Sequence, residues 1–275
     1  MAMDQAKVIS IGDLFRESWS LYRERVRILT KIILLPVAFL VAGDLLGLFA
    51  PSGLASLPAF IGTIISFFAY LALIFALQEN IQFGEAYRRA WKKIWSYGWL
   101  TLLSGFAVLG GFVMLVIPGV IFSIWFAFAT YVFVIEEEKG MSALLRSREY
   151  VRDYWWQVFG RQIVFGLAAL VVIIFLGLVG TVLGGEAGAS FVVNLFILIL
   201  APFTVAYVYT LYQNLKSLKP EVASQPPIGP RGFFYFSAVL GILGIIVFMV
   251  LMVLAAALLV SGGLGQDVLP SALPR

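Results

Sequence analysis

Long apolar runs are the feature that most limits how this chain can fold. A helix needs about 20 apolar residues to cross the hydrocarbon core of a bilayer, and the 275 residues contain seven windows of that kind. Of all residues 61% are hydrophobic and 12% are charged, whereas soluble domains carry roughly 25% charged residues. The sequence therefore predicts an all-α, polytopic transmembrane helix bundle. The predicted spans are residues 32–50, 57–77, 99–117, 119–135, 164–183, 191–212 and 233–260.

The third and fourth spans form one apolar stretch from Tyr97 to Ile135. A single helix of that length would measure about 55–60 Å, which is twice the thickness of the hydrocarbon core. Pro118 and Gly119 stand near the middle of the stretch, and a Pro-Gly pair interrupts helices. We therefore expect two short helices with a turn at Pro118-Gly119.

The Lys and Arg residues predict how the spans are oriented. Of these 19 residues, 18 lie before the first span or in the loops after spans two, four and six, and only Arg275 follows the last span. Because basic loops stay on the cytoplasmic side, we expect a cytoplasmic N-terminus and an external C-terminus in a bacterial or archaeal plasma membrane. The first apolar stretch follows 30 residues of charged sequence. This order predicts a permanent first anchor rather than a cleaved signal peptide.

An amphipathic segment precedes the first, third and fifth spans. The three segments align at Leu14, Ala86 and Ala143, and each carries a small residue four positions further on. Charged and apolar residues separate onto two faces in each segment, as in helices that lie at a membrane surface. We therefore predict three repeats, each an interfacial helix followed by a transmembrane hairpin. The small residues are Ser18, Ala90 and Ser147.

The predicted domain organisation follows from these segments. Residues 1–80, 81–137 and 138–214 form the three repeats. Residues 215–232 are rich in Pro and Gly and predict a flexible linker. Residues 233–260 are an additional seventh span outside the six-helix core, and residues 261–275 are a disordered tail.

Basic residues on the amphipathic segments are candidate contacts for anionic lipid headgroups. A well-placed Lys or Arg favours an anionic membrane surface by about 1 kcal/mol, and the Trp and Tyr residues of the same segments are typical of the membrane–water interface. The alternative is that the segments only anchor each hairpin. The candidates are Arg16, Arg88, Arg89, Lys92, Lys93, Arg146 and Arg152.

Asp44 is the only carboxylate well inside a predicted span. Ionisable residues inside a membrane often mark transport or coupling sites. Asp44 also lies between Gly43 and Gly47, a spacing that allows close helix approach. With Asn194 of the sixth span it forms the candidate intramembrane polar site. The alternative is a hydrated carboxylate near the outer boundary and an amide that hydrogen-bonds to another helix.

Three consecutive acidic residues, Glu136, Glu137 and Glu138, follow the fourth span. We expect them to pair with Arg146 or Arg148, or to form a solvated turn. Three adjacent glutamates on one helix cannot all face a single cation, which counts against a metal site.

The chain contains no His and no Cys. Their absence excludes disulfides, thiolate nucleophiles, Ser-His-Asp triads and sites built from Cys and His ligands. No Walker A, Rossmann or nucleophile-elbow motif is present. We therefore expect neither an enzyme nor a bound cofactor or metal. The net charge of +4 belongs to membrane-facing loops, so we expect no nucleic-acid partner.

Several motifs between residues 110 and 165 occur together. They are Ile117-Pro118-Gly119, the acidic run followed by Gly140, Ala143-Leu144-Leu145-Arg146-Ser147, and Trp155-Trp156-Gln157-Val158-Phe159. This region resembles the membrane domain attached to some bacterial glycerophosphodiester phosphodiesterases, and related six-helix bacterial membrane proteins. The resemblance implies a helical membrane domain and assigns no catalytic residues. Two departures are the lack of a soluble phosphodiesterase domain and the seventh span, and that enzyme chemistry needs histidines.

The sequence thus predicts a non-enzymatic membrane protein that organises or binds lipids, or binds a protein partner or a second copy of itself. The alternative is a transporter of a small solute or lipid, with a path between the hairpin units. Asp44 and Asn194 would line that path.

Overall fold

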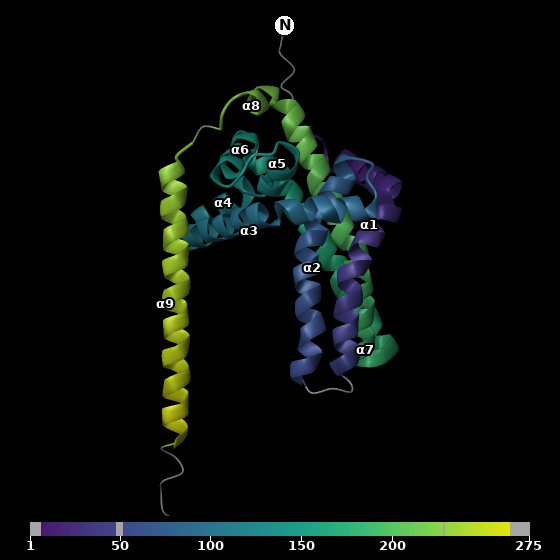
Figure 1. The fold of residues 1–275 in the computed structure, drawn as a ribbon, viewed down its shortest axis with the longest axis vertical. Helices are drawn as coiled ribbons and strands as arrows, with labels where there is room; N and C mark the ends of the chain where they lie inside the picture. The colour runs from purple at the N-terminus through teal and green to yellow at the C-terminus, as the bar shows by residue number, and fades with distance from the viewer. Residues whose placement is uncertain (1–6, 48–51, 228, 265–275) are drawn as a thin grey trace, which may run out of the picture. The chain divides into compact units, whose positions relative to one another are not determined.

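The computed structural model describes residues 7–47, 52–227 and 229–264, and within these ranges it contains helices and no strand. Figure 1 shows their arrangement. The helices are α1 (Ile11–Gly47), α2 (Ser52–Gln78), α3 (Phe83–Met114), α4 (Val116–Trp125), α5 (Ala129–Ile135), α6 (Met141–Arg152), α7 (Trp155–Leu218), α8 (Pro220–Ser224) and α9 (Arg231–Leu264).

Seven stretches among the described residues are long and apolar enough to cross a membrane. This confirms the predicted number and order of spans. α7 holds two of them, because its backbone is non-helical at Gly184 and Gly185. Gly185 has a φ of 64°, a conformation that favours glycine, so the chain reverses there. The stretches are Ile11–Gly43, Ser56–Gln78, Phe83–Met114, Val116–Ile135, Trp155–Gly185, Leu195–Leu218 and Arg231–Ala257.

The chain divides into two compact units. Unit 1 comprises Met1–Thr101 and Ile124–Gly229, and unit 2 comprises Leu102–Ser123 and Pro230–Arg275. The first half of α3 therefore belongs to unit 1, and its second half joins most of α4 and all of α9 in unit 2.

The turn between the third and fourth spans lies at Leu115, which precedes the predicted Pro-Gly position by three residues. Pro118 instead occupies the first turn of α4, where a proline is tolerated because the first N–H groups of a helix have no helical acceptor. A Cβ at Gly119 would overlap the ring of Phe112 on α3. The predicted pair of helices is confirmed, and Gly119 allows the two helices to pack closely.

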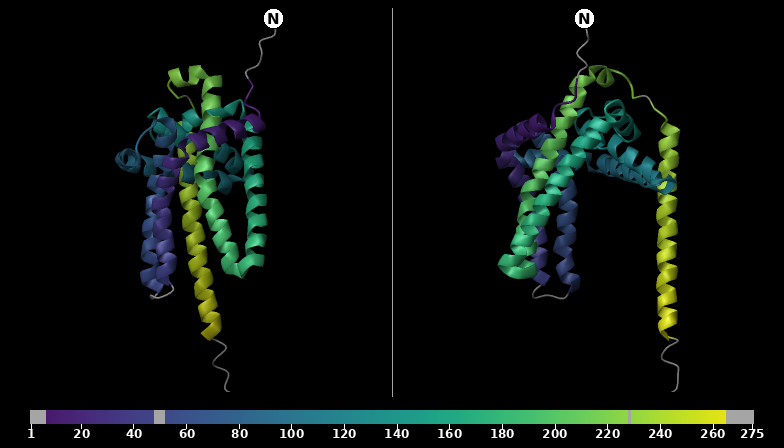
Figure 2. Two further views of the ribbon diagram at one scale, coloured as in Figure 1. Left: turned by 90° about the vertical axis from the view of Figure 1, so that its right-hand side faces the viewer. Right: turned by 180° about the vertical axis from the view of Figure 1, so that it is seen from behind.

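Only the third predicted interfacial helix is a separate element, α6. The first two are continuous with the spans that follow them, in α1 and α3. No proline stands at either junction, so nothing in the local sequence forces a break. Figure 2 shows the N-terminal part of α1 lying across one end of α7 before the chain turns and runs beside α2.

Aromatic side chains form much of the core of unit 1. Phe15 of α1 contacts both halves of α7, with ring centroids 5.9 Å from Phe165 and 5.2 Å from Tyr207. Two buried tyrosines donate their hydroxyls to backbone carbonyls, Tyr131 to Val205 O at 3.2 Å and Tyr207 to Arg161 O at 3.0 Å. The six aligned positions of the predicted repeats are also fully buried; they are Leu14, Ser18, Ala86, Ala90, Ala143 and Ser147.

α9 packs on α3 in unit 2 through a line of small residues. Ser237 Oγ donates to the carbonyl oxygen of Ala107 at 2.8 Å. A Cβ at Gly110 would overlap the carbonyl of Ser237, and one at Gly241 would overlap the carbonyl of Phe106. Small residues let helices approach closely enough for such contacts.

The predicted flexible linker, residues 215–232, is partly helical, because it includes the last residues of α7, the whole of α8 and the first residues of α9. Pro220 opens α8, in the first-turn position that proline favours. The predicted disordered tail falls partly on α9, which continues to Leu264, while residues 265–275 lie outside the described residues.

Candidate functional site

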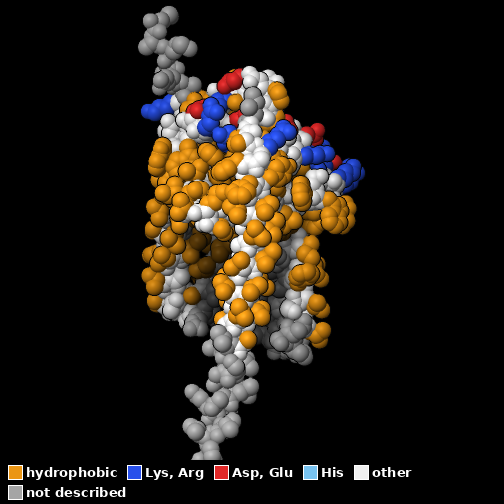
Figure 3. All heavy atoms as spheres, turned by 90° about the vertical axis from the view of Figure 1, so that its left-hand side faces the viewer, with side chains coloured by type: hydrophobic (Ala, Val, Ile, Leu, Met, Phe, Trp, Pro, Cys, Tyr) orange, Lys and Arg blue, Asp and Glu red, His pale blue; other side chains and the backbone are white. Residues whose placement is uncertain are grey.

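Exposed tryptophans accompany basic residues in unit 1. Five of the seven tryptophans are exposed, and Trp95 is 90% exposed. Figure 3 shows the charged side chains of unit 1 gathered at one end of that unit. Exposed aromatic residues beside charged ones are typical of the membrane–water interface. The five are Trp19, Trp91, Trp95, Trp99 and Trp156.

One exposed face of α3 carries both kinds of residue. Arg88 and Lys92 are exposed and one helical turn apart, and residues three or four apart lie on the same side of a helix. Trp91, Trp95 and Trp99 follow at the same spacing. We call these five residues the α3 surface.

Two smaller pairs have the same composition. Arg16 precedes Trp19 on α1 by three residues, and Arg152 at the end of α6 precedes Trp156 by four. Each of these basic side chains is exposed, although Arg16 lies 3.4 Å from Asp13 and Arg152 lies 3.4 Å from Asp153. Surface ion pairs of this kind hold little energy, so both cations stay accessible.

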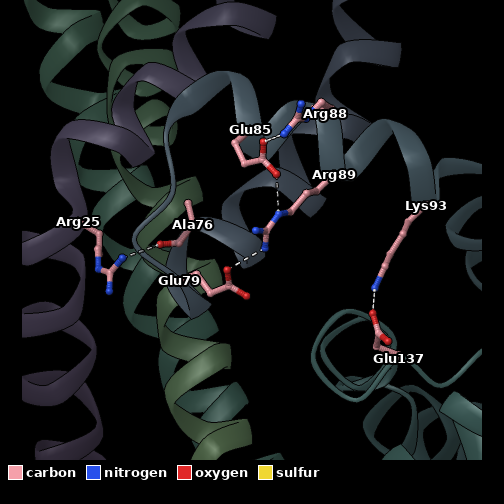
Figure 4. Close-up of polar contacts among 8 residues, drawn as sticks. All are labelled: Arg25, Ala76, Glu79, Glu85, Arg88, Arg89, Lys93 and Glu137. Carbon is pink, nitrogen blue, oxygen red and sulfur yellow. Dashed lines mark hydrogen bonds and ion pairs between the residues drawn. The ribbon is translucent and has the colours of Figure 1, made fainter.

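The other two basic residues of the run on α3 point toward glutamates, as Figure 4 shows. Arg89 lies 2.8 Å from Glu79 and 2.9 Å from Glu85. Lys93 Nζ lies 2.9 Å from Glu137 Oε1. The four basic residues thus form two stripes, of which the inner one is neutralised by glutamates.

Glu85 also contacts the outer stripe. It pairs with Arg88 as well as with Arg89, and these contacts are drawn in Figure 4. Arg88 nevertheless remains 68% exposed. Lys92 makes no ion pair among the described residues, so the outer stripe keeps unneutralised charge.

Arg146 is buried, with its side chain 6% exposed. Its guanidinium lies 2.6 Å from Glu138 and 3.5 Å from Glu136, and it donates to the carbonyl of Val222 on α8. A side chain enclosed in this way cannot reach a lipid headgroup. The structure therefore does not support Arg146 as a headgroup contact. Its contacts join α6 to the glutamate run and to α8.

Glu136 is the centre of a buried polar cluster at the end of α5. Its carboxylate accepts hydrogen bonds from Tyr150, at 2.8 Å, and from Tyr212. Lys216 lies 3.3 Å away. Burial and the neighbouring carboxylate raise the pKa of Tyr150, so its hydroxyl stays protonated and donates. The two cations Arg146 and Lys216 balance Glu136 and Glu138, which is what a buried carboxylate requires.

The predicted pairing of the glutamate run with Arg146 is confirmed, whereas Arg148 instead lies over the ring of Trp125, 4.8 Å from its centroid. Burial lowers the pKa of Arg148. The run does not converge on one point, because Glu137 reaches α3 while its two neighbours reach α6 and α7. Within the described ranges, no group of three or more His, Cys, Asp or Glu residues is placed to hold a metal ion.

Ser147 fills a break between α4 and α5. Its hydroxyl donates to the carbonyl of Trp125 at 2.6 Å and accepts from the amide of Phe128 at 3.2 Å. Broken helices of transporters use such freed backbone groups to bind ions, but here a side chain of α6 satisfies them. Residues 119–135 contain no proline at the break, so the local sequence holds no signal for it.

α8 is held on α6 by Lys219 as well as by Arg146. Lys219 Nζ lies 2.6 Å from Asp153 Oδ2 and donates to the carbonyl of Glu149 at 2.7 Å. The hydrogen bond from Lys219 lowers the pKa of Asp153. No local sequence pattern indicates the roles of Lys219, Lys216 and Tyr212, because their partners lie more than 60 positions away.

The described part of the structure does not test the candidate intramembrane polar site. Asp44 belongs to α1 and Asn194 to α7, but both side chains lie outside the described part of the chain. The predicted role of these two residues stays a prediction.

The chain matches no family model, no curated protein and no solved structure. Its functional assignment therefore depends on the chemistry of the residues described above. The contrast between exposed and internally paired basic residues is the most specific part of that chemistry.

Proposed function

We propose that this chain is a non-enzymatic integral membrane protein that binds anionic lipids at the membrane–water interface. The α3 surface is the main contact, and the Arg16–Trp19 and Arg152–Trp156 pairs add to it. One observation carries the proposal: each exposed candidate cation precedes an exposed tryptophan by three or four residues, whereas the less exposed candidates bind glutamates. The exposed set is Arg16, Arg88, Lys92 and Arg152, and the inner set is Arg89, Lys93 and Arg146.

The two residue types have complementary tasks at a lipid surface. An indole ring is amphipathic and settles at headgroup depth, while a nearby Lys or Arg attracts an anionic headgroup. Their alternation on one face of α3 presents both to the same lipid. We propose that this face lies on the cytoplasmic side of a bacterial or archaeal membrane, in agreement with the bias of basic loops.

The finer architecture belongs to the same proposal. Three repeats are supported by the burial of all six aligned positions. The resemblance to the membrane domain of glycerophosphodiester phosphodiesterases agrees with a role beside lipids that needs no catalytic residues. Transport through the bundle is the less favoured candidate, because Ser147 occupies the break between α4 and α5. A protein partner and self-association stay predictions.

Lipid preference can be measured with tryptophan fluorescence. The full chain is reconstituted into bilayers of brominated phosphatidylglycerol and phosphatidylcholine with matched acyl chains, and quenching of the exposed tryptophans reports which lipid contacts them. We expect the wild type to prefer phosphatidylglycerol. In the variant Arg88→Gln/Lys92→Gln, the preference for phosphatidylglycerol over phosphatidylcholine should fall by up to about fivefold for each charge removed. This factor corresponds to about 1 kcal/mol per charge.

The matched control is Lys139→Gln/Arg231→Gln. It removes two exposed charges from positions that have no tryptophan within four residues, and we expect it to keep the wild-type preference. Equal quenching by both lipids in the wild type, or an equal loss in both variants, would show that the α3 surface does not select headgroups.

A further inference from the structure

The rotational setting of α3 decides which of its basic residues face outward. Successive residues on an α-helix are separated by about 100°. A rotation by one residue would therefore exchange Lys92 for Lys93 and would carry Trp95 toward the protein. The α3 surface exists only while α3 is held in one orientation about its own axis.

Lys93 is the inner cation of α3 that contacts both α2 and the end of α5. It is 27% exposed and lies over two aromatic rings, 5.5 Å from the centroid of Phe75 on α2 and 5.8 Å from that of Phe133 on α5. Its ammonium group reaches Glu137 just beyond the end of α5. Figure 4 shows the two side chains pointing toward one another. This contact joins α3 to the α5–α6 turn.

Glu137 has an unusual backbone for its residue type. Its φ is 60°, and it is the one non-glycine residue with positive φ among those that the structure describes. Glycine normally occupies the position after a helix C-cap, because the left-handed conformation crowds a Cβ. The side chain is otherwise 78% exposed. Its contact with Lys93 is therefore the visible reason for a glutamate here, and Lys93 lowers the pKa of Glu137 so that the carboxylate stays charged.

We propose that Glu137 is a positioning residue for the α3 surface. Its ion pair with Lys93 adds to the packing of the buried residues Ala86 and Ala90 in setting the orientation that turns Arg88, Lys92 and the tryptophans outward. The importance of this setting for lipid binding rests on the function proposed above. The setting itself is a property of the fold and can be measured separately.

A reporter on the outward face of α3 tests the orientation. The chain has no native Cys, so Gly84→Cys carries a spin label at one position only. A side chain at Gly84 meets open space, and so does one at Gly12 on α1, where Gly12→Cys gives a matched control. Power-saturation measurements in proteoliposomes of phosphatidylglycerol and phosphatidylcholine report the depth of each label.

We expect Glu137→Gln to shift the depth of the label at position 84 and to leave that at position 12 unchanged. Glu137→Gly, which relaxes the backbone but lacks the carboxylate, should behave like Glu137→Gln. The charge exchange Lys93→Glu/Glu137→Lys should restore the wild-type depth. In unlabelled protein, Glu137→Gln should also lower the preference for phosphatidylglycerol by up to about fivefold, although the loss of one negative charge by itself would raise it. The charge exchange should recover the wild-type preference.

The outcomes separate the two proposals. Unchanged label depth in Glu137→Gln, with the fold verified by thermal unfolding, overturns the positioning role and leaves lipid binding untouched. A shifted label together with a lipid preference that neither Glu137→Gln nor Arg88→Gln/Lys92→Gln alters supports positioning and overturns the proposed function. Failure of the charge exchange to restore the depth shows that the ion pair does not set the orientation.

Discussion

The hydroxyl of Ser147 lies 2.6 Å from the carbonyl oxygen of Trp125, and this contact closes the gap between α4 and α5. The hydroxyl oxygen of Ser147 also accepts from the amide of Phe128, so one side chain of α6 satisfies a donor and an acceptor in a broken helix. Unsatisfied backbone groups are costly away from water. Ser147 therefore stabilises the interrupted backbone between α4 and α5.

Replacement of Ser147 tests that role. Ser147→Ala leaves the Trp125 carbonyl and the Phe128 amide without this partner, and we expect a loss of about 1–3 kcal/mol in the free energy of unfolding. Urea unfolding in detergent micelles, followed by tryptophan fluorescence, measures the change. Ser142→Ala is the matched control, since Gly140 is the N-cap of α6 and no side chain caps that helix. Equal stability of both variants would contradict the role.

The buried charge cluster predicts that replacing Arg146 will lower the free energy of unfolding strongly. Arg146→Gln removes the cation that Glu136 and Glu138 share, and removal of one member of a buried ion pair costs about 3–5 kcal/mol. Exposed Arg152 on the same helix should tolerate glutamine with a change of less than about 0.5 kcal/mol. Adding Glu138→Gln to Arg146→Gln should recover part of the loss. Purely additive losses in the same unfolding assay would show that the two side chains do not interact.

The Lys219–Asp153 contact predicts a pH dependence for the docking of α8. The pKa of Asp153 is lowered from its usual 3.8 by the hydrogen bond from Lys219, so the contact stabilises the folded state above that pH and the effect disappears as the pH falls through the lower folded value. Asp153→Asn should speed hydrogen exchange in α8 at pH 7. Below the folded pKa, it should match the wild type.

The matched control for this measurement is Glu221→Gln. It removes an exposed negative charge from α8 itself, at a residue with no ion pair among the described ones. Exchange in this variant should follow the wild type at every pH. A pH-independent difference between Asp153→Asn and the wild type would contradict the ion pair as its cause.

The close packing of α3 against α9 predicts that a pair of introduced cysteines can form a disulfide between them. A Cβ built on Gly244 lies 3.9 Å from Cβ of Val113, close to the mean separation of about 3.8 Å in disulfides. Val113→Cys/Gly244→Cys should therefore cross-link under mild oxidation, which changes the mobility of the full chain on a non-reducing gel. Adding Gly110→Ala should slow the reaction several-fold because its Cβ overlaps the Ser237 carbonyl. Gly105→Ala, which meets open space, should leave the rate unchanged.

The position of Glu85 predicts that removing its charge will strengthen the binding of anionic lipid. It pairs with both Arg88 and Arg89 and so reduces the positive charge of the α3 surface. Glu85→Gln should raise the preference for phosphatidylglycerol over phosphatidylcholine, by no more than about the fivefold effect of one charge. High salt should reduce the gain, because exposed charges are screened. An unchanged or lowered preference would show that Glu85 does not oppose headgroup binding.

The sequence by itself determined the number and order of the candidate spans. The thickness of the hydrocarbon core sets a length of apolar chain that can be counted residue by residue. The pairing of Arg146 with the glutamate run was also predictable, since charges about ten positions apart in a turn and helix lie within reach of each other. Local chemistry was sufficient in both cases.

Only the tertiary structure decided which charges are available. All four basic residues of the run on α3 were predicted as headgroup contacts, and the ion pairs of Arg89 with Glu79 and of Lys93 with Glu137 divide them into an outer and an inner stripe. Ser147 likewise acquires its role only because α6 meets the break between α4 and α5. Such partners are set by the packing of elements distant in the chain, and no local pattern of residues specifies which side chains meet.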